Sequence, residues 1–317
     1  GLVMTNIFSI LCLNNLVMFK GINAIEFSKR FQTNKDCYEY LVSIKWANGY
    51  ACSRCGCTES HKGRMFYYRR CKKCGYDESV TANTVFHGVK IPMLKAFHMV
   101  FRITSKKKGM STIELGTEVG VQQKTAWLFK RKVQAVMNRD KNDKLNGDVH
   151  VDETLIGGFS SAVGRSTETK EALVVAVEIL PDGRTGNLSL EHIESFKADE
   201  LKFAIKKIVS EDAAIQTDAY HSYKKLAKEM SNITIQYSQK GSTMEELHKQ
   251  IMQFKNWLRG THHHCSSEYL FAYTAEYEYR FNRRNKRKVL FNDVLRRMIH
   301  QIPHPYNYLK TLCVYNT

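Results

Sequence analysis

The sequence predicts an α/β protein in which an N-terminal metal-binding ribbon and a helix-turn-helix precede a mixed sheet flanked by helices. Two Cys-x2-Cys pairs lie near the N-terminus, and two short amphipathic helical patterns follow them. After residue 147 the hydrophobic pattern changes from a helical period to the alternating or continuous runs typical of strands. With 317 residues, the chain is long enough for two or three folded units.

The charge of the chain indicates a polyanionic partner. There are 48 Lys and Arg against 31 Asp and Glu, a net charge of +17. Such an excess favours nucleic acid, because each phosphate that a cation neutralises releases condensed counterions. A solvated basic surface is the alternative, but here the basic residues cluster beside aromatic ones.

Residues 1–23 are expected to be an N-terminal extension of uncertain role, because Met4 and Met18 are both candidate start residues. The apolar run 7–13 is too short for a membrane helix and lacks the basic leader of a signal peptide. The nine cysteines are odd in number and partly scattered, which argues against a secreted disulfide framework. We therefore expect a cytoplasmic protein without a membrane partner.

The two cysteine pairs predict a structural zinc site. Fifteen residues separate Cys52-x2-Cys55 from Cys71-x2-Cys74, a spacing that can place four thiolates around one Zn²⁺. Four protein ligands leave no open coordination position, so the metal would stabilise the fold. Reduced cysteines packed as small hydrophobes are the alternative. Residues 24–90, a helical lead-in and this ribbon, are expected to bind DNA through Arg69, Arg70, Lys72 and Lys73.

Residues 91–140 predict a DNA-binding helix-turn-helix. A helix is expected over 93–104, Ser111-x-x-Glu114 is a capping box for a second, and Gly120 offers a turn before a third over 122–136. Two amphipathic helices joined by a short turn also occur without DNA binding. The candidate contacts are Gln122, Gln123 and Lys124 to base edges and phosphates, and Lys130 and Arg131 to the DNA backbone.

Residues 147–300 carry the pattern of a ribonuclease-H-like sheet, with 301–317 as a tail. Three strand patterns come first, and helix, strand, helix and strand follow before a final helical region. The strand candidates are 149–155, 171–179, 186–191, 212–218 and 233–237, and the helices between them are 198–209 and 220–230.

Two aspartates on these strands suggest a catalytic metal site. Asp152 follows Val149 and Val151 at strand alternation, and Asp218 ends the fourth strand pattern. Adjacent strands can hold two carboxylates a few ångströms apart, which is costly unless a cation such as Mg²⁺ lies between them. A single aspartate at a strand end is more often a turn or cap residue, so the pairing needs other support.

Six ordered motifs over about residues 24–290 supply that support. They are Trp46-x2-Gly49-x2-Cys52-x2-Cys55-Gly56, residues 111–127, His150 to Gly158, Thr217-Asp218-Ala219-Tyr220-x2-Tyr223, Phe254 to His263 and Tyr279 to Arg284. In this order they resemble the zinc-ribbon insertion-sequence transposases of prokaryotes, relatives of the eukaryotic Merlin elements. The sequence departs from that pattern at Ser53, Leu155 and His264-Cys265.

The resemblance implies a DDE-type enzyme that cleaves transposon ends and joins them to target DNA with two ions of Mg²⁺ or Mn²⁺. Asp152 and Asp218 would be the first two metal-binding acids. The implied partners are double-stranded DNA and further copies of the chain on paired ends, in the nucleoid of a prokaryote. A DNA-binding regulator, a silent transposase derivative and a simple metal nuclease are the alternatives.

The third catalytic group has two candidates. Relatives place it on a helix with a basic residue seven positions later, and His248 with Lys255 matches that position, on a helix capped by Ser242 and ended by Gly260. Glu276 with Arg283 has the same spacing and the better ligand for Mg²⁺. The DNA backbone is expected to meet Arg259, Arg280, Arg283 and Arg284.

Overall fold

The computed structural model describes residues 18–314 apart from 22, 141, 158–169, 238–242 and 263–266. They form two compact units. The first unit runs to Val136 and includes Lys286–Tyr306, and the second comprises Met137–Asn285 and the residues from Asn307 onward. The sequence had placed 286–300 with the sheet, whereas the contacts group this segment with the N-terminal helices.

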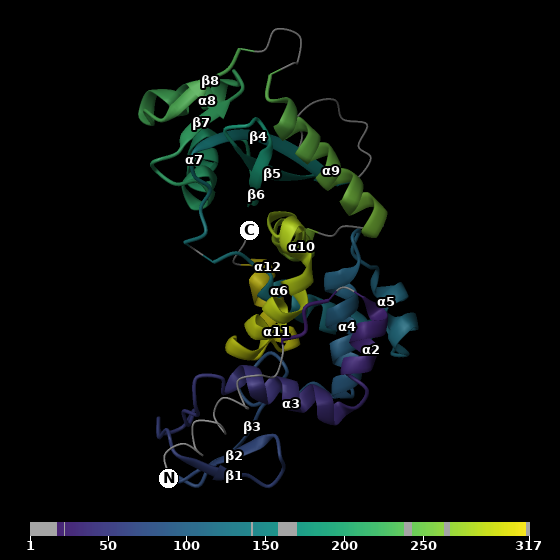
Figure 1. Cartoon of the computed structure of the whole chain (residues 1–317). Coiled ribbons are helices and arrows are strands. Elements are labelled where there is room, and N and C mark those ends of the chain that lie inside the picture. Colours follow the sequence, from purple (N-terminus) through teal and green to yellow (C-terminus); the bar gives the residue numbers. More distant parts are fainter. Residues whose placement is uncertain are drawn as a thin grey trace. The chain divides into compact units, whose positions relative to one another are not determined.

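The ribbon of the first unit is a three-stranded antiparallel sheet in the order β1-β2-β3 (Figure 1). Gly56 and Gly75, one residue after each cysteine pair, adopt the left-handed conformation with φ of 71° and 69°. Each glycine N–H donates to the carbonyl of the first cysteine of its pair, so the two pairs form matching tight turns. The strands are Ser60–Lys62, Tyr68–Cys71 and Asp77–Ser79.

Aromatic rings form the core of the helical part of the first unit. Phe291 packs against Phe27, Phe31, Phe97 and Phe101, with ring centroids 5.5 to 6.2 Å apart. The contacts of the Phe291 ring with four other buried rings explain why α11, near the end of the chain, packs with helices from its beginning. The helices are α2 (Ala24–Arg30), α3 (Asn34–Lys45), α4 (Met93–Ser105), α5 (Thr112–Val119), α6 (Gln123–Val136) and α11 (Leu290–His300).

The helices α5 and α6 form the predicted helix-turn-helix. Gly120 ends α5 in the left-handed conformation with φ of 66°, a conformation that a glycine adopts without strain. Ser111 Oγ accepts the Glu114 N–H at 3.1 Å, but the Glu114 carboxylate binds Lys106 Nζ at 3.1 Å. Only the first half of the predicted capping box therefore forms among the described residues, because an ion pair competes for the carboxylate.

The second unit is built on a five-stranded mixed sheet in the order β6-β5-β4-β7-β8, which confirms the predicted fold class. β4 pairs antiparallel with β5 and parallel with β7. The sequence-based strand limits differ from the observed ones by two residues or fewer. The strands are β4 (Asp148–Gly157), β5 (Lys170–Ile179), β6 (Thr185–Ile193), β7 (Ala214–Thr217) and β8 (Ile233–Ile235).

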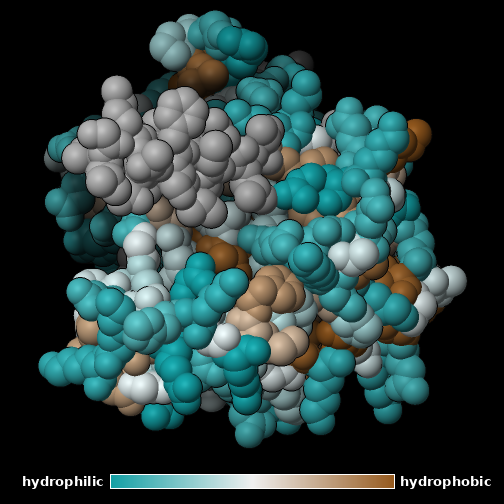
Figure 2. Space-filling model, turned by 60° about the horizontal axis from the view of Figure 1, so that its bottom comes forward, coloured by the Kyte–Doolittle hydropathy of each residue, from teal (hydrophilic) through white to brown (hydrophobic). Residues whose placement is uncertain are grey.

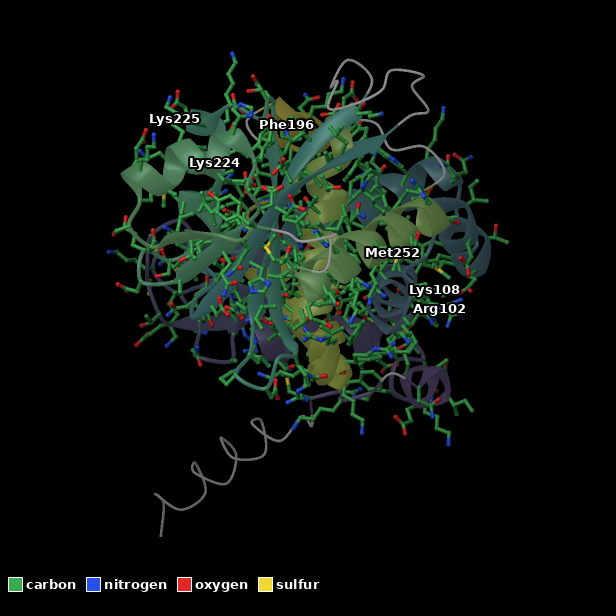
Figure 3. All side chains as sticks on the ribbon, turned by 90° about the horizontal axis from the view of Figure 1, so that it is seen from above. Arg102, Lys108, Phe196, Lys224, Lys225 and Met252 are labelled. Atoms are coloured by element: carbon green, nitrogen blue, oxygen red, sulfur yellow. The ribbon has the colours of Figure 1, made fainter. Side chains whose placement is uncertain are left out.

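Helices cover both faces of this sheet. Leu201 and Leu226, of α7 and α8, share a core with Val151 on one face, and Leu247 and Tyr273, of α9 and α10, share a core with β5 and β6 on the other. Figure 3 shows α8 with Lys224 and Lys225, and α9 with Met252, on either side of the strands. The helices are α7 (Ala198–Ile208), α8 (His221–Glu229), α9 (Glu245–Thr261) and α10 (Leu270–Asn282).

Two expectations for α9 and the chain termini change. α9 continues through Thr261, so Gly260, predicted to end it, lies inside the helix. The predicted cap Ser242 and residues 1–17 lie outside the described residues. The remaining elements are the 3-10 helices η1 (Ser267–Tyr269) and η2 (Arg284–Val289) and the helix α12 (Tyr306–Val314).

The surface is mainly hydrophilic on the face drawn in Figure 2, with small separate hydrophobic spots. Within the described residues, no helix has the length and apolar character that crossing a membrane requires.

Candidate metal centres and nucleic-acid interface

The parallel pairing of β4 with β7 brings the two predicted aspartates together. The paired positions run from Asp148 with Ala214 to Val151 with Thr217, so Asp152 and Asp218 follow directly at the end of β7. In the sheet, β4 lies between two strands, with antiparallel β5 on one side and parallel β7 on the other. Asp218 lies just beyond the carboxyl end of β7, whereas Asp152 lies midway along β4, which continues to Gly157.

Three carboxylates meet beside the end of β7. Asp152, Glu153 and Asp218 each contribute an oxygen, and these oxygens all lie within 4.8 Å of one another. Asp152 Oδ1 accepts the Glu153 N–H at 2.8 Å, and Asp218 Oδ1 accepts the Tyr220 N–H at 3.0 Å. Oxygen ligands at about 2.1 Å in an octahedron lie about 3 to 4 Å apart, so this donor set suits Mg²⁺ or Mn²⁺.

His248 of α9 lies beside this cluster. Its Nε2 is 3.4 Å from Asp152 Oδ2, and its side chain is 47% exposed. The charge of Asp152 also acts on Lys255, which lies two helical turns after His248 on α9. Burial, followed by the charge of Arg259, lowers the pKa of Lys255, while the Asp152 carboxylate opposes this shift. The two residues predicted on α9 therefore lie on the side of that helix that faces the acids.

Glu276 lies elsewhere in the second unit. Its side chain is fully buried on α10, and its Oε1 is 3.7 Å from Nη1 of Arg280 on the same helix. Arg283, its predicted partner, stacks on the Tyr279 ring at 4.1 Å. α10 packs on β6, the edge strand of the sheet farthest from β8. The described structure therefore brings neither member of this predicted pair to the acid cluster.

The four predicted cysteines form a second candidate metal centre. Their Sγ atoms lie within 4.8 Å of one another, with Cys52 to Cys74 at 3.6 Å and Cys55 to Cys71 at 3.5 Å. Sulfurs bound to one tetrahedral zinc at about 2.3 Å lie about 3.8 Å apart, whereas a disulfide requires about 2 Å. Cys57 Sγ lies instead 3.8 Å from the Glu59 carbonyl.

The polarity around Cys52 and Cys71 favours thiolates. At Cys55 the main-chain N–H of Cys57 lowers the pKa, but burial and the hydrogen bonds with the other three thiols outweigh it and raise the pKa to about 12. Burial raises the pKa of the Cys52 thiol, but the main-chain N–H groups of Arg54 and Cys55 outweigh that effect and hold the pKa below its usual value. For Cys71, the main-chain N–H of Cys74 lowers the pKa. Because zinc binds the thiolate, N–H groups that stabilise thiolates suit a metal site.

Most of the predicted DNA contacts in the first unit are accessible. Arg69 is half-buried, and its guanidinium lies 5.4 Å from the centre of the Trp46 ring. The remaining candidates of the ribbon and of the start of α6 are exposed, as is the second-unit candidate Arg259. The exposed candidates are Arg70, Lys72, Lys73, Gln122, Gln123, Lys124 and Arg259.

Four residues that were predicted to contact the DNA backbone pair with oxygen atoms of the protein. Lys130 is 1% exposed and donates to the Met110 carbonyl at 2.7 Å, and Arg131 is 5% exposed and donates to Gln134 at 2.7 Å. Arg280 faces Glu276, and Arg284 donates to the carbonyls of Thr185 and Phe281. The head groups of these four residues therefore already bind protein oxygens, and their contact with DNA stays a prediction.

Glu153 was not among the residues predicted for the acid cluster. Strand alternation sends Glu153 to the opposite face of β4 from Asp152, so the period alone placed it away from the site. Its nearness follows from the end of β7 at Thr217, which leaves the position beside Glu153 without a strand partner from β7. The sequence pattern placed the end of this strand at Asp218, one residue later than the observed end of β7, so the sequence carried no signal for Glu153.

Charge is divided unequally between the units. The first unit carries 27 Lys and Arg against 9 Asp and Glu, a net charge of +18, whereas the second carries 21 against 22, a net charge of −1. The cationic character of the chain therefore belongs to the unit that holds the ribbon and the helix-turn-helix.

Two protein families match the chain. The family described as a transposase zinc-ribbon domain matches residues 32–77, which include all four clustered cysteines. The family described as an ISXO2-like transposase domain matches residues 144–282, which include the acid cluster and α9. No curated protein matches the chain.

Proposed function

We propose, from the premise that this chain belongs to the zinc-ribbon transposases of insertion sequences, that it binds the ends of its element, cleaves them and joins them to target DNA. The observation that carries the proposal is the meeting of Asp152 and Asp218 from two parallel strands, within the segment that matches a transposase domain. Close carboxylates repel one another unless a cation lies between them, so this arrangement is built for a divalent metal.

Asp152 and Asp218 would hold the metal through the oxygens that face each other. Their Oδ1 atoms already accept main-chain N–H groups, which fixes the direction of each carboxylate. Bound divalent ions supply Lewis-acid polarisation of the scissile phosphate and lower the pKa of a bound water. His248, 3.4 Å from Asp152, would be the third group that binds or orients at this site.

Lys255 would bind the phosphate that reacts. It lies near Asp152 and is half-buried, and a partly desolvated ammonium attracts a phosphate oxygen more strongly than a fully solvated one. Neutralising the charge that builds on that phosphate is a main source of catalysis in phosphoryl transfer.

The first unit would supply DNA binding. Its net charge of +18 and the exposed Gln122, Gln123 and Lys124 at the start of α6 suit phosphate and base contacts in a major groove. A structural Zn²⁺ at the four cysteines would hold the ribbon in shape for this task. Joining two ends implies at least two copies of the chain on paired ends, in the nucleoid of a prokaryotic cell.

The test is cleavage of a DNA duplex that carries the element's end, with the aspartates neutralised singly. Asp152→Asn and Asp218→Asn should each lower the cleavage rate in Mg²⁺ by at least about 1,000-fold, because each removes a charged ligand of the metal while preserving shape. DNA binding should remain.

Asp148→Asn is the matched control. It makes the same change on the same strand, at a residue that binds Gln216 instead of the cluster. If either cluster variant cleaved at the wild-type rate, the active site would lie elsewhere. A wild-type chain that bound the ends but cut in neither Mg²⁺ nor Mn²⁺ would be a DNA-binding regulator or a silent derivative.

A further inference from the structure

The loop between β1 and β2 of the ribbon carries two exposed apolar side chains at its tip. It comprises residues 63–67, Gly-Arg-Met-Phe-Tyr, between Lys62 and Tyr68 (Figure 1). Met65 is 49% exposed and Phe66 is 38% exposed. Turns usually carry glycine, proline or small polar residues, which suit both the backbone and water. A methionine and a phenylalanine at this tip are therefore explained neither by the turn nor by burial.

The contacts of the tip hold it in one shape. The Tyr68 N–H donates to the Met65 carbonyl at 2.9 Å, so Phe66 lies at a central position of this turn. The next residue, Tyr67, stacks its ring on that of Tyr38 in α3, with centroids 4.2 Å apart and planes 11° from parallel. The Phe66 ring meets the Tyr67 ring edge-on at 5.0 Å. Because the tip is supported in this way, binding through Phe66 costs little conformational entropy.

The ribbon that carries this tip is cationic. Residues 50–80 contain 7 Lys and Arg against 3 Asp and Glu, a net charge of +4. Each of the three acids lies within 3.8 Å of a cation, in the pairs Glu59–Lys72, Asp77–Arg64 and Glu78–Lys45. Such a surface attracts a polyanion and repels a second copy of itself, which would bring the same positive charge. Charge complementarity therefore favours DNA as the occupant of the apolar tip.

Two of these cations flank the tip. The side chain of Arg64, the residue before Met65, is 70% exposed, donates to the Tyr68 hydroxyl at 2.8 Å and lies 3.8 Å from Asp77. Lys62, at the end of β1, is exposed. An apolar group between cations suits insertion into a duplex, because the cations hold the phosphates while the apolar group replaces part of the stacking between bases.

We propose that Phe66, with Met65 beside it, is an apolar wedge that enters the minor groove of bound DNA and separates two neighbouring base pairs. The proposal rests on the proposed DNA binding by the first unit and adds a distortion of the duplex to it. The minor groove is about 6 Å wide, which excludes a helix but admits the tip of a loop. Lys62 and Arg64 would bind the flanking phosphates, and the duplex would bend away from the tip.

The test uses fluorescence of a duplex that carries the element's end, bound to the full chain without Mg²⁺ or Mn²⁺ so that no DNA is cut. One set of duplexes carries 2-aminopurine at successive positions, because the emission of this base rises when it loses stacking. Another duplex carries a dye at each end, so that a bend increases energy transfer between the dyes. The wild-type chain should raise the 2-aminopurine emission at one base step and should bend the duplex.

Substitutions at the tip should remove these two signals. Phe66→Ala should abolish the rise in emission, reduce the bend and weaken DNA binding by about 10-fold, because the cations keep their phosphate contacts while the ring is lost. Phe66→Trp keeps a flat ring and should keep both signals, and Met65→Ala should reduce the bend. Phe203→Ala, at a phenylalanine of α7 that is 72% exposed, is the matched control and should behave like wild type. Zinc content and melting temperature should be unchanged in all four variants.

The outcomes separate the wedge from the proposed function. A wild-type chain that bound the duplex without bending it or raising the emission would overturn the wedge and leave DNA binding in place, whereas a chain that bound no DNA would overturn both. Equal losses in Phe66→Ala and Phe203→Ala would also overturn the wedge. If Phe66→Ala lost its zinc, Met65→Ala would test the same tip, and an unchanged bend in that variant would contradict the proposal. If Phe66→Ala kept the rise in emission but dissociated an oligomer in sedimentation without DNA, the tip would be a contact between copies of the chain instead.

Discussion

At the residue scale, the third group of the site is decided by what each side chain can reach. His248 lies on α9, 3.4 Å from Asp152, whereas Glu276 is buried on α10 against Arg280. The better ligand chemistry of a carboxylate for Mg²⁺ counts for less in a side chain that is fully buried beside Arg280. Distance therefore supports His248 over Glu276.

Substitutions at these two positions should behave differently. His248→Ala should lower cleavage by at least about 100-fold, and His248→Glu should retain activity with Mg²⁺, since it restores an oxygen ligand. Wild-type activity should favour Mn²⁺ and fall in acid, because a protonated imidazole cannot bind metal, and this acid loss should be weaker in His248→Glu.

Glu276→Gln should cleave within a few-fold of wild type, provided that melting shows the fold is intact. Gln253→Ala, at an exposed position of α9, controls for helix stability. A fully active His248→Ala together with an inactive Glu276→Gln would reverse the assignment.

Ser53, which departs from the resembled family pattern at a position where proline is usual, is explained by its contacts. Its Oγ donates to Glu78 Oε2 at 3.2 Å and accepts from Asn83 Nδ2 at 3.1 Å. Glu78 is also 2.9 Å from Lys45 Nζ of α3. The serine thus joins a partly buried polar network that ties the first cysteine turn to the strand β3 and to a helix, a role that a proline side chain cannot fill.

At the scale of elements, side chains of α10 cover the outer edge of β6. Asn282 Oδ1 accepts the Leu188 N–H at 2.8 Å, and its Nδ2 donates to the Leu188 carbonyl at 2.9 Å. Glu278 accepts the N–H of Leu190. These bonds replace those of a missing neighbouring strand, and a covered edge cannot pair with another chain.

The buried Glu278 at this edge should make the free energy of unfolding depend on pH. Burial raises the pKa of Glu278 to about 7, opposed by the nearby Arg139. The folded state then holds a proton that the unfolded chain releases near pH 4.5, so stability falls as pH rises from about 4.5 to about 7, by up to about 3 kcal/mol. Above that range both states are ionised, and this dependence ends.

Urea unfolding at several pH values measures this slope. Glu278→Gln should flatten it between pH 5 and 7, whereas Glu171→Gln, on β5 beside His192, should leave the decline in place. An unchanged decline in Glu278→Gln would assign the dependence to another group.

At the scale of the whole molecule, the two units differ in net charge. The first unit, at +18, is suited to hold DNA, and the second, at −1, presents a cluster of acids that would repel phosphate without metal. Affinity for DNA should therefore be nearly independent of the catalytic metal and should fall steeply with salt.

The salt dependence can be assigned to particular lysines. Changing Lys72 and Lys73 together to Gln should reduce the slope of log K against log salt by about 2, because each phosphate contact contributes about 0.9. Changing Lys206 and Lys228, which are exposed on α7 and α8, removes the same charge from the second unit and should alter the slope much less. Equal effects from both pairs would contradict the division of charge, and an affinity independent of salt would contradict phosphate binding altogether.

The sequence by itself determined the features that depend on local spacing. Three of these features depend on only a few neighbouring residues: the cysteine pairs, the alternation along β4 and β5, and the glycine turn at Gly120. The net charge depends on composition alone. The order of elements then predicted the mixed sheet, and the placing of Asp152 and Asp218 on neighbouring strands followed from it.

Only the tertiary structure decided which distant residues meet. Phe291 closes a core of rings more than 180 residues earlier in the chain, Lys130 turns inward to the Met110 carbonyl, and Glu153 reaches the acids from the far face of β4. The physical reason is that burial and charge pairing depend on the end of a partner strand or the position of a partner helix, and these leave no periodic trace in the local sequence.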